Sequence, residues 1–317
     1  MNPPRAFWRF FSGRFPAPRY LAYVVLWPAG ILGALAPLRP PGAAVGPGVA
    51  EQVCGALAVF VILFFMRAVD EVKDLDYDRE FNPGRPLVTG ETEVAAVRVY
   101  LAGSAVAAVA LSAVVGAAAV VTAVLIMAYS LFLLLLERVS ERFRESVWGN
   151  IVVTIQLKTG LVCYVALLAG SELAWSDGAG TPALPTALVV LSFVLAYLHW
   201  EIARKTVRAR FALPGEKLYS TARGAAWSLG AAVALMLAAC GLRVAVALGP
   251  DAAEVRPAAP AVLAVPLALV LWNVLAFRGH REARHTAGGP AFAAYLAFLA
   301  AGAVQPALMG EAPGWFG

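Results

Sequence analysis

The charged connection at residues 67–93 contains the side chains most capable of chemistry, and it begins directly after a long apolar run. Successive residues of a helix advance by about 100°, so Glu71, Asp74 and Asp78 fall within one narrow stripe. Asp70 lies at the edge of that stripe. Carboxylates gathered on one face repel one another unless a cation joins them. Oxygen ligands of this kind suit Mg²⁺, which commonly bridges protein carboxylates to substrate phosphates.

The alternative interpretation of this connection is a solvated helix beside a membrane. Such a helix normally alternates acidic and basic residues so that i,i+4 pairs form. Here the acids are concentrated on one stripe, which favours a functional role. Arg67 precedes the stripe by one turn, and Arg85 follows the helix end that Pro83 and Gly84 predict. We expect both guanidiniums to bind an anionic substrate group.

A second charged connection, at residues 199–223, is basic. One acid and three bases have the i, i+3, i+4, i+7 spacing of a helical face; they are Glu201, Arg204, Lys205 and Arg208. A cationic face opposite an acidic one suits a diphosphate, which the acidic face reaches through Mg²⁺ and the cationic face by charge-assisted hydrogen bonds. The alternative is the ordinary positive charge of a cytoplasmic loop. After the break at Pro214, a lid before the next span is expected from Lys217, Tyr219 and Ser220, and Lys217 and Tyr219 are also expected to bind the diphosphate.

Lys158 lies well inside an apolar run. An ionisable side chain at that depth is costly, so it is a functional hypothesis by default. We expect Lys158 to reach the diphosphate or an anionic acceptor and to take part in catalysis. The alternative is a lysine that snorkels to the interface or hydrogen-bonds to a neighbouring helix.

Membrane-spanning helices must position these residues. The chain has 317 residues, of which 61% are hydrophobic and 14% charged, whereas ordinary soluble domains are nearer half apolar and a quarter charged. Nine apolar runs are long enough to cross a bilayer; they lie near 20–38, 48–66, 94–115, 117–136, 147–169, 183–200, 223–247, 259–277 and 289–309. We predict an all-α, polytopic bundle of nine transmembrane helices that forms a single domain over residues 1–317.

Lysine and arginine gather before the first run and in every second connection. The positive-inside rule therefore predicts a cytoplasmic N-terminus and places both charged connections, and with them the active site, on the cytoplasmic side. The net charge of +5 needs no nucleic-acid partner, because these basic residues line one face of a membrane protein. The composition, rich in Ala and Arg, indicates a bacterial-type inner or plasma membrane.

These residues also carry a family resemblance. Asp70-Glu71-x-x-Asp74-x-x-x-Asp78, followed by Asn82-Pro83-Gly84-Arg85-Pro86-Leu87 and Gly90, resembles the first aspartate-rich motif of the UbiA superfamily of intramembrane prenyltransferases. That motif usually reads Asn-Asp-x-x-Asp-x-x-x-Asp, so Asp70 stands at the usual Asn and Glu71 at the first usual Asp. The nine runs, the cytoplasmic N-terminus and the two charged connections are also similar to that family.

The second family motif normally carries two or three aspartates in a D-x-x-x-D arrangement. Here Glu201 is the only acid near its start, and Arg204 and Lys205 stand where further acids would be expected. We expect cationic side chains to replace part of a second Mg²⁺ site. The metal ligands that the resemblance implies are Asp70, Glu71, Asp74, Asp78 and Glu201.

The resemblance implies an enzyme that ionises an isoprenoid diphosphate with Mg²⁺ and transfers the prenyl group to an aromatic or lipid acceptor. The residues expected to carry the catalysis are Asp74, Asp78 and Lys158. The first alternative keeps the ionisation but has no acceptor, so that the chain closes on itself as in a UbiA-type terpene cyclase. A remote alternative is a lipid transporter, but transporters usually place ionisable groups and broken helices near the bilayer midplane, whereas most charge here lies at one surface.

Overall fold

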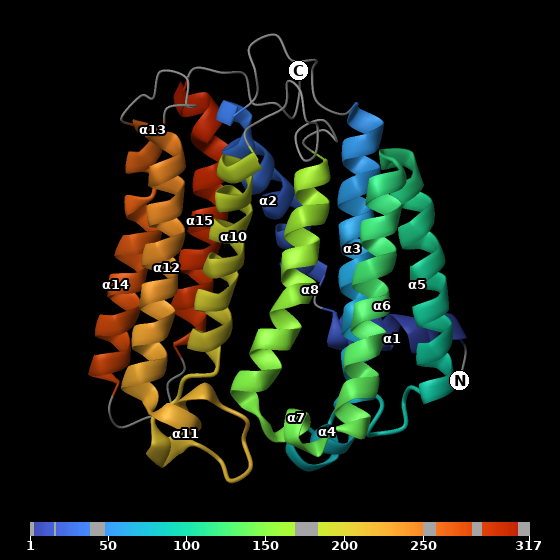
Figure 1. Ribbon diagram of the computed structural model, residues 1–317. Coiled ribbons are helices and arrows are strands. Elements are labelled where there is room, and N and C mark those ends of the chain that lie inside the picture. Colours follow the sequence, from blue (N-terminus) through green and yellow to red (C-terminus); the bar gives the residue numbers. More distant parts are fainter. Residues whose placement is uncertain are drawn as a thin grey trace. The chain divides into compact units, whose positions relative to one another are not determined.

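The computed structural model describes residues 3–15, 17–38, 48–168, 183–249, 258–280 and 287–309. Within these ranges every regular element is a helix, which confirms the all-α prediction (Figure 1). The chain divides into two compact units. The first unit comprises Met1–Val25 and Gly48–Glu145, and the second comprises Leu26–Pro47 and Ser146–Gly317.

The first unit is built on three long apolar helices that pack against one another: α3 (Val49–Lys73), α5 (Val94–Val115) and α6 (Ala117–Val139) (Figure 1). Only Gly116 separates α5 from α6, and its φ of 138° is a conformation that residues with a Cβ rarely adopt. Two short helices, α4 (Leu75–Phe81) and α7 (Glu141–Glu145), follow α3 and α6. The charged connection therefore starts within the last turns of α3, a helix that packs against both α5 and α6.

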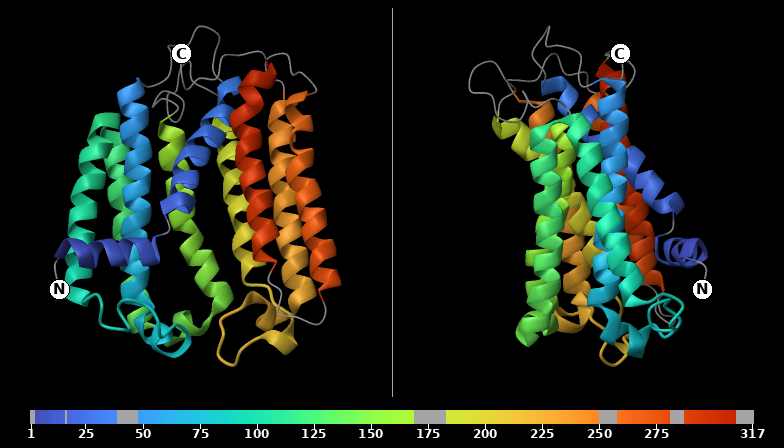
Figure 2. Two further views of the ribbon diagram at one scale, coloured as in Figure 1. Left: turned by 180° about the vertical axis from the view of Figure 1, so that it is seen from behind. Right: turned by 90° about the vertical axis from the view of Figure 1, so that its right-hand side faces the viewer.

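The N-terminal helix α1 (Pro3–Arg14) runs across the axes of α3 and α5 (Figure 2). Its aromatic side chains, with the following Phe15, contact Phe60 and Phe64 of α3 and Tyr100 of α5. Phe10 and Phe15 are fully buried in these contacts. This packing fixes the end of α1, where Arg14 lies. The next helix, α2 (Ala17–Leu35), begins in the first unit and continues into the second.

The second unit contains the rest of α2 and η1 (Ala36–Leu38). Its long helices are α8 (Val147–Leu167), α10 (Ala183–Arg204), α12 (Ala225–Ala247), α14 (Ala264–Gly279) and α15 (Gly288–Met309). Helix α10 packs against α8, α12 and α15, and α14 packs against α12 and α15. The second charged connection contains two short elements, η2 (Ala209–Phe211) and α11 (Tyr219–Arg223).

Eight helices in the described ranges are long and apolar enough to cross a membrane. The eighth of the nine predicted runs is less regular, because it begins as α13 (Ala258–Ala261) and continues as the 16-residue α14. Pro266 has no N–H to give to the carbonyl of Val262, which accepts from Val265 N–H at 3.2 Å instead. A turn with a hydrogen bond three residues back thus replaces the regular helical turn, which explains why the helix is interrupted at residues 262–263. The count of nine spans stays a prediction.

Candidate functional site

The predicted acidic stripe is carried by two helices with one residue between them. Helix α3 ends at Lys73, and Asp74 joins it to α4. The Asp74 N–H bonds to the Asp70 carbonyl and the Asp78 N–H bonds to the Asp74 carbonyl, both at 2.8 Å. The chain therefore continues almost as one helix through the motif. Asn82 ends α4 directly before Pro83, as the sequence predicts.

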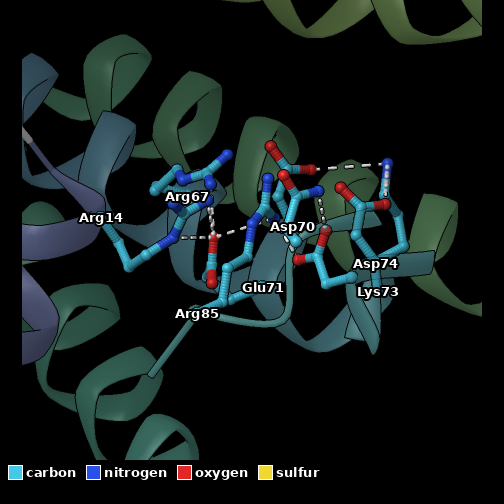
Figure 3. A network of polar contacts seen from close by, with 9 residues as sticks. Arg14, Arg67, Asp70, Glu71, Lys73, Asp74 and Arg85 are labelled. Carbon is cyan, nitrogen blue, oxygen red and sulfur yellow. Dashed lines mark hydrogen bonds and ion pairs between the residues drawn. The ribbon is translucent and has the colours of Figure 1, made fainter. Parts of the chain in front are cut away.

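Glu71 is the centre of a group of arginines. Its side chain is fully buried, and its Oε1 accepts hydrogen bonds from Arg14 Nε at 2.7 Å and from Arg67 Nη2 (Figure 3). Arg85 Nη1 lies 3.7 Å from the same oxygen. The other oxygen, Oε2, has no hydrogen-bond partner among the described residues. Arg14 was not predicted from the sequence, because it is 57 residues from Glu71 and belongs to no local pattern.

Asp78 completes this group. It is 2% exposed, and it accepts hydrogen bonds from Arg85 Nη1 and, at 3.0 Å, from Asn82 Nδ2. Arg85 thus connects Asp78 to Glu71. We call Arg14, Arg67 and Arg85, with Glu71 and Asp78, the arginine cluster. Its three guanidiniums and two carboxylates carry a formal net charge of +1.

The remaining acids surround Lys73. Its Nζ lies 3.5 Å from Asp70 Oδ1, 3.8 Å from Asp74 Oδ1 and 3.4 Å from Glu137 Oε1 on α6. We call these four residues the acidic cluster, whose formal net charge is −2. The side chains of Asp70 and Asp74 are 45% and 37% exposed, so both remain accessible. Glu137 was missed from the sequence, and its only signal was an acid at the end of an apolar run that shares the side of residues 67–93.

The pKa of the Asp74 carboxyl is raised to about 6. Its partial burial is the main cause, since it removes water from the charged form. Lys73 opposes this effect, whereas the neighbouring carboxylates of Asp70 and Glu137 add to it by repulsion. The raised pKa of Asp74 thus reflects mainly its burial, with Lys73 and the neighbouring carboxylates acting in opposite directions.

The donor atoms of the acidic cluster fit a magnesium ion. In the described part of the chain no three acidic, histidine or cysteine side chains gather closely enough to hold a metal by themselves. Mg²⁺, however, is commonly bound through only one or two carboxylates together with substrate phosphates. Asp70 and Asp74 can supply such a pair. Glu71 and Asp78 fit less well, because guanidiniums occupy their oxygens.

The second charged connection, in the other unit, differs from its predicted form. Helix α10 ends at Arg204, so the helical face expected from Glu201 to Arg208 is wrong beyond that point. The chain turns because Lys205 and Thr206 N–H groups bond three residues back, to Ile202 and Ala203. The segment then runs beside residues 219–220, with the Tyr219 N–H bonded to the Lys205 carbonyl at 3.2 Å and Val207 N–H to Ser220 Oγ at 3.0 Å.

Glu201, the single acid of this connection, is 8% exposed and already paired. Arg204 donates to both of its oxygens, and Lys205 Nζ lies 3.4 Å from Oε1. Arg204 also lies over the Trp200 ring, and Lys205 lies over the Tyr219 ring. Both cationic side chains remain partly exposed, at 41% and 33%. Arg204 and Lys205 thus form a basic surface, and the charge of the one carboxylate beside them, Glu201, is already compensated.

Arg208 has a structural contact that the sequence did not reveal. Its Nη2 donates to the Phe277 carbonyl at 2.6 Å, near the end of α14, and its guanidinium lies 4.8 Å from the centre of the Phe277 ring. A cation there satisfies a carbonyl that the helix leaves unpaired. Tyr219 is buried against Trp148, and that burial raises the pKa of its hydroxyl. Lys217 is half-buried in the turn before α11.

Lys158, predicted to be catalytic, lies on α8 with its Nζ 5.2 Å from the centre of the Tyr197 ring of α10. Tyr197 is the first member of an aromatic group on α10 and α15. Its ring packs edge-on against Trp200 and Tyr295, and Trp200 stacks on Tyr295. Phe292 also contacts Trp200. The lysine is therefore placed beside aromatic side chains.

Solved structures place this architecture among known membrane proteins. A UbiA homologue from Aeropyrum pernix K1 is similar over 90% of this chain and 97% of its own, with a TM-score of 0.57 and 20% identity. A UbiA homologue from Archaeoglobus fulgidus bound to GPP and Mg²⁺ is similar over 92% and 99%, with a TM-score of 0.53 and 16% identity. The chain has the fold of the UbiA homologues. This finding confirms the resemblance that the motif at residues 70–90 indicated.

A third similar structure comes from a structural study of digeranylgeranylglyceryl phosphate synthase in membranes. It is similar over 96% of this chain and 99% of its own, with a TM-score of 0.59 and 14% identity. No family model and no curated protein sequence matches the chain. The UbiA fold and the eight long apolar helices identify an integral membrane protein. The likeness is one of fold, so the activity has to be argued from the side chains.

Proposed function

We propose that the protein is a magnesium-dependent prenyltransferase of the UbiA superfamily that works as one domain in a bacterial-type plasma membrane. The observation that carries this proposal is the division of the motif into an acidic cluster and an arginine cluster. A diphosphate bound to a divalent cation needs both carboxylates for the cation and positive side chains for its own oxygens. The likeness to a UbiA homologue bound to GPP and Mg²⁺ supports an isoprenoid diphosphate as the substrate.

In the proposed reaction the bond between the allylic carbon and the diphosphate oxygen breaks, and both electrons leave with the diphosphate. Asp70 and Asp74 would hold a Mg²⁺ ion, which would supply positive charge to the leaving group. Arg67 and Arg85 hold its oxygens by charge-assisted hydrogen bonds, and we propose Arg204, Lys205 and Lys217 as further contacts. The allylic cation is then attacked by an electron-rich acceptor, aromatic or lipid, which loses a proton to complete the transfer.

Asp70 and Asp74 are the residues that we propose to hold the metal. The exposure of both carboxylates, and the presence of the Glu137 carboxylate 3.4 Å from the Lys73 Nζ that they share, support this assignment. Lys158 stays a proposed catalytic residue, because a cation beside a neutral aromatic group in a membrane helix can bind an anionic acceptor. The cytoplasmic position of the site rests on the charge pattern of the connections.

A UbiA-type terpene cyclase is the second candidate, and the aromatic group on α10 and α15 favours it. The faces of aromatic rings stabilise carbocations by cation–π attraction. The ring centroids of Tyr197, Trp200 and Tyr295 lie 5.6–6.3 Å apart. In this reaction a double bond of the same chain attacks the cation, and loss of a proton or capture of water ends the sequence.

Product analysis without an acceptor separates the two candidates. The purified protein is incubated with Mg²⁺ and geranyl, farnesyl or geranylgeranyl diphosphate. Intact diphosphate, or simple hydrolysis, is the result expected of a transferase, and addition of aromatic and lipid acceptors should then give a prenylated product. A cyclic hydrocarbon or alcohol would establish the cyclase. A protein that leaves all three substrates unchanged with every acceptor contradicts both.

A further inference from the structure

We infer that Glu71 is not a metal ligand but a positioning carboxylate, which holds Arg14, Arg67 and Arg85 as a direct binding site for the diphosphate. Arg14 is the new member of this site, and it comes from the N-terminal helix α1. The inference rests on the proposed function for the identity of the ligand, and it assigns the two clusters separate tasks. The acidic cluster takes the metal, and the arginine cluster takes the diphosphate without it.

The hydrogen-bonding capacity of the arginine cluster supports an anion site. Each guanidinium has five N–H donors, and the contacts with Glu71 and Asp78 use only a minority of them. Arg67 Nε has no partner among the described residues. The side chains of Arg14, Arg67 and Arg85 are 17%, 21% and 20% exposed, so a ligand can reach them. Planar guanidiniums match the oxygens of a phosphate in pairs.

The same contacts exclude Glu71 as a favourable metal ligand. Its side chain is fully buried, and Oε1 is taken by two guanidiniums. A divalent cation placed there would be repelled by three positive groups at short range. Among the described residues, the one cation that forms an ion pair with Asp70 or Asp74 is Lys73. The residue that replaces the usual first aspartate has therefore changed its partner from metal to arginine.

Helix α1 supplies Arg14 through its aromatic face. Phe10 and Phe15 flank the arginine in sequence and are fully buried, against Phe64 and Tyr100 in one case and Phe60 and Phe64 in the other. These contacts fix the last turn of α1, so the Arg14 side chain is already positioned beside Glu71. Binding a ligand would therefore cost this side chain little conformational entropy. Figure 3 shows Arg14 approaching Glu71 from a different helix than Arg67.

The inference is tested by binding of inorganic pyrophosphate in EDTA, measured by calorimetry on the purified protein in detergent. The unmodified protein should bind it without a metal. Arg14→Ala should weaken binding by about tenfold or more, as expected when a charge-assisted hydrogen bond to an anion is lost. Arg14→Lys, which keeps the charge, should restore part of the affinity. Arg79→Ala is the matched control, because Arg79 pairs with Asp76 on the exposed side of α4.

Glu71 gives the sharper test, because Coulomb attraction alone and positioning predict opposite results. Removing a negative charge should tighten anion binding if Glu71 has no orienting role. We expect Glu71→Ala to weaken pyrophosphate binding by about tenfold, and Glu71→Gln to weaken it less, since an amide oxygen can still accept from the arginines. Mn²⁺ binding, followed by electron paramagnetic resonance, should change by less than about threefold in both.

Three outcomes overturn the inference: no pyrophosphate binding by the unmodified protein in EDTA, unchanged or tighter binding by both Glu71 variants, or loss of Mn²⁺ binding in Glu71→Gln while pyrophosphate binding persists. A cooperative thermal unfolding transition shows that each variant is folded. If Glu71→Ala does not fold, Glu71→Gln alone is used for the test. If the protein turns over a prenyl diphosphate but fails these tests, only the inference fails. If it passes them but consumes no prenyl diphosphate, the anion site stands and the proposed function fails.

Discussion

Arg204 donates two hydrogen bonds to Glu201, from Nε to Oε2 at 2.6 Å and from Nη2 to Oε1 at 2.7 Å. Glu201 is the only acid near the start of the second charged connection, and both of its carboxylate oxygens accept hydrogen bonds from the Arg204 guanidinium. A carboxylate in that state offers little to a metal ion. The second connection has few acids in its sequence, and in the structure the one acid near its start is already paired with an arginine.

We expect Glu201→Gln to leave Mn²⁺ affinity within about threefold of that of the unmodified protein. The reason is that Arg204 and Lys205 already engage both oxygens. The substitution should instead lower the melting temperature by a few degrees, as a change at a buried pair commonly does. Electron paramagnetic resonance and thermal unfolding measure the two effects. A loss of Mn²⁺ binding with an unchanged melting temperature would restore Glu201 as a ligand.

The basic side of this connection is tested by replacing both of its exposed cations. We expect Arg204→Ala combined with Lys205→Ala to weaken binding of a non-hydrolysable prenyl diphosphate by at least about tenfold, since two charge-assisted contacts are lost. Arg210→Ala is the matched control, because Arg210 belongs to the same connection and its guanidinium lies over the neighbouring Phe211 ring. Equal affinities in all three proteins would mean that Arg204 and Lys205 only set the topology.

Asp74→Asn should reduce turnover by at least about 100-fold and weaken Mn²⁺ binding by at least about tenfold. The side chain keeps its size but loses the charge that a metal ligand needs. Asp76→Asn, two residues away and 95% exposed, should leave both quantities unchanged. Steady-state kinetics and calorimetric titration provide the numbers. If Asp74→Asn is folded and fully active, the assignment of the metal to the acidic cluster is incorrect.

The raised pKa of Asp74 predicts the pH dependence of metal binding. Below about pH 6 the carboxyl holds a proton that competes with the metal, so Mn²⁺ affinity should fall by up to tenfold per pH unit as the pH decreases. In the metal-free protein the sign is opposite for stability. The folded state binds this proton more tightly than the unfolded state, whose pKa is about 3.9, so the contribution of Asp74 to the free energy of unfolding rises as the pH falls from above 6 to below 4. Asp74→Asn should remove both effects.

The sequence predicted the helical class and eight of the long spans, because these depend on local composition and spacing. Glu71 and Asp78 lie two turns apart on consecutive helices, so the helical period explains why both reach Arg85. Asp74, predicted on the same stripe, lies beside Lys73 instead. Arg14 and Glu137 could not be predicted in the same way, because each reaches the motif from another helix. Their positions depend on tertiary packing that no spacing in one sequence encodes.

The second connection shows the limit of a helical period. Glu201 and Arg204 lie on α10 as predicted, but Arg208 lies beyond its end and contacts the α14 carbonyl of Phe277. Thr206 and Val207 are β-branched and favour extended structure. The Val207 N–H lies beyond the end of α10 and donates to Ser220 Oγ. This partner is 13 residues along the chain, so the break depends on a contact that the period alone does not reveal.

The approach of α2 to α15 gives a prediction about stability that is independent of catalysis. A Cβ on Gly33 would lie 2.3 Å from the Gly302 carbonyl oxygen, a backbone atom that has little room to move. Gly33→Ala should therefore destabilise the protein by about 1–3 kcal/mol, as overpacking of a close contact commonly does. Gly230→Ala on α12 is the matched control, because no atom outside its own turn lies within 4 Å of the added methyl group. It should be neutral or slightly stabilising, since alanine favours helix over glycine. Thermal unfolding in one detergent compares the two variants directly, and a Gly33→Ala protein as stable as the Gly230→Ala protein would mean that the two helices do not need this close contact.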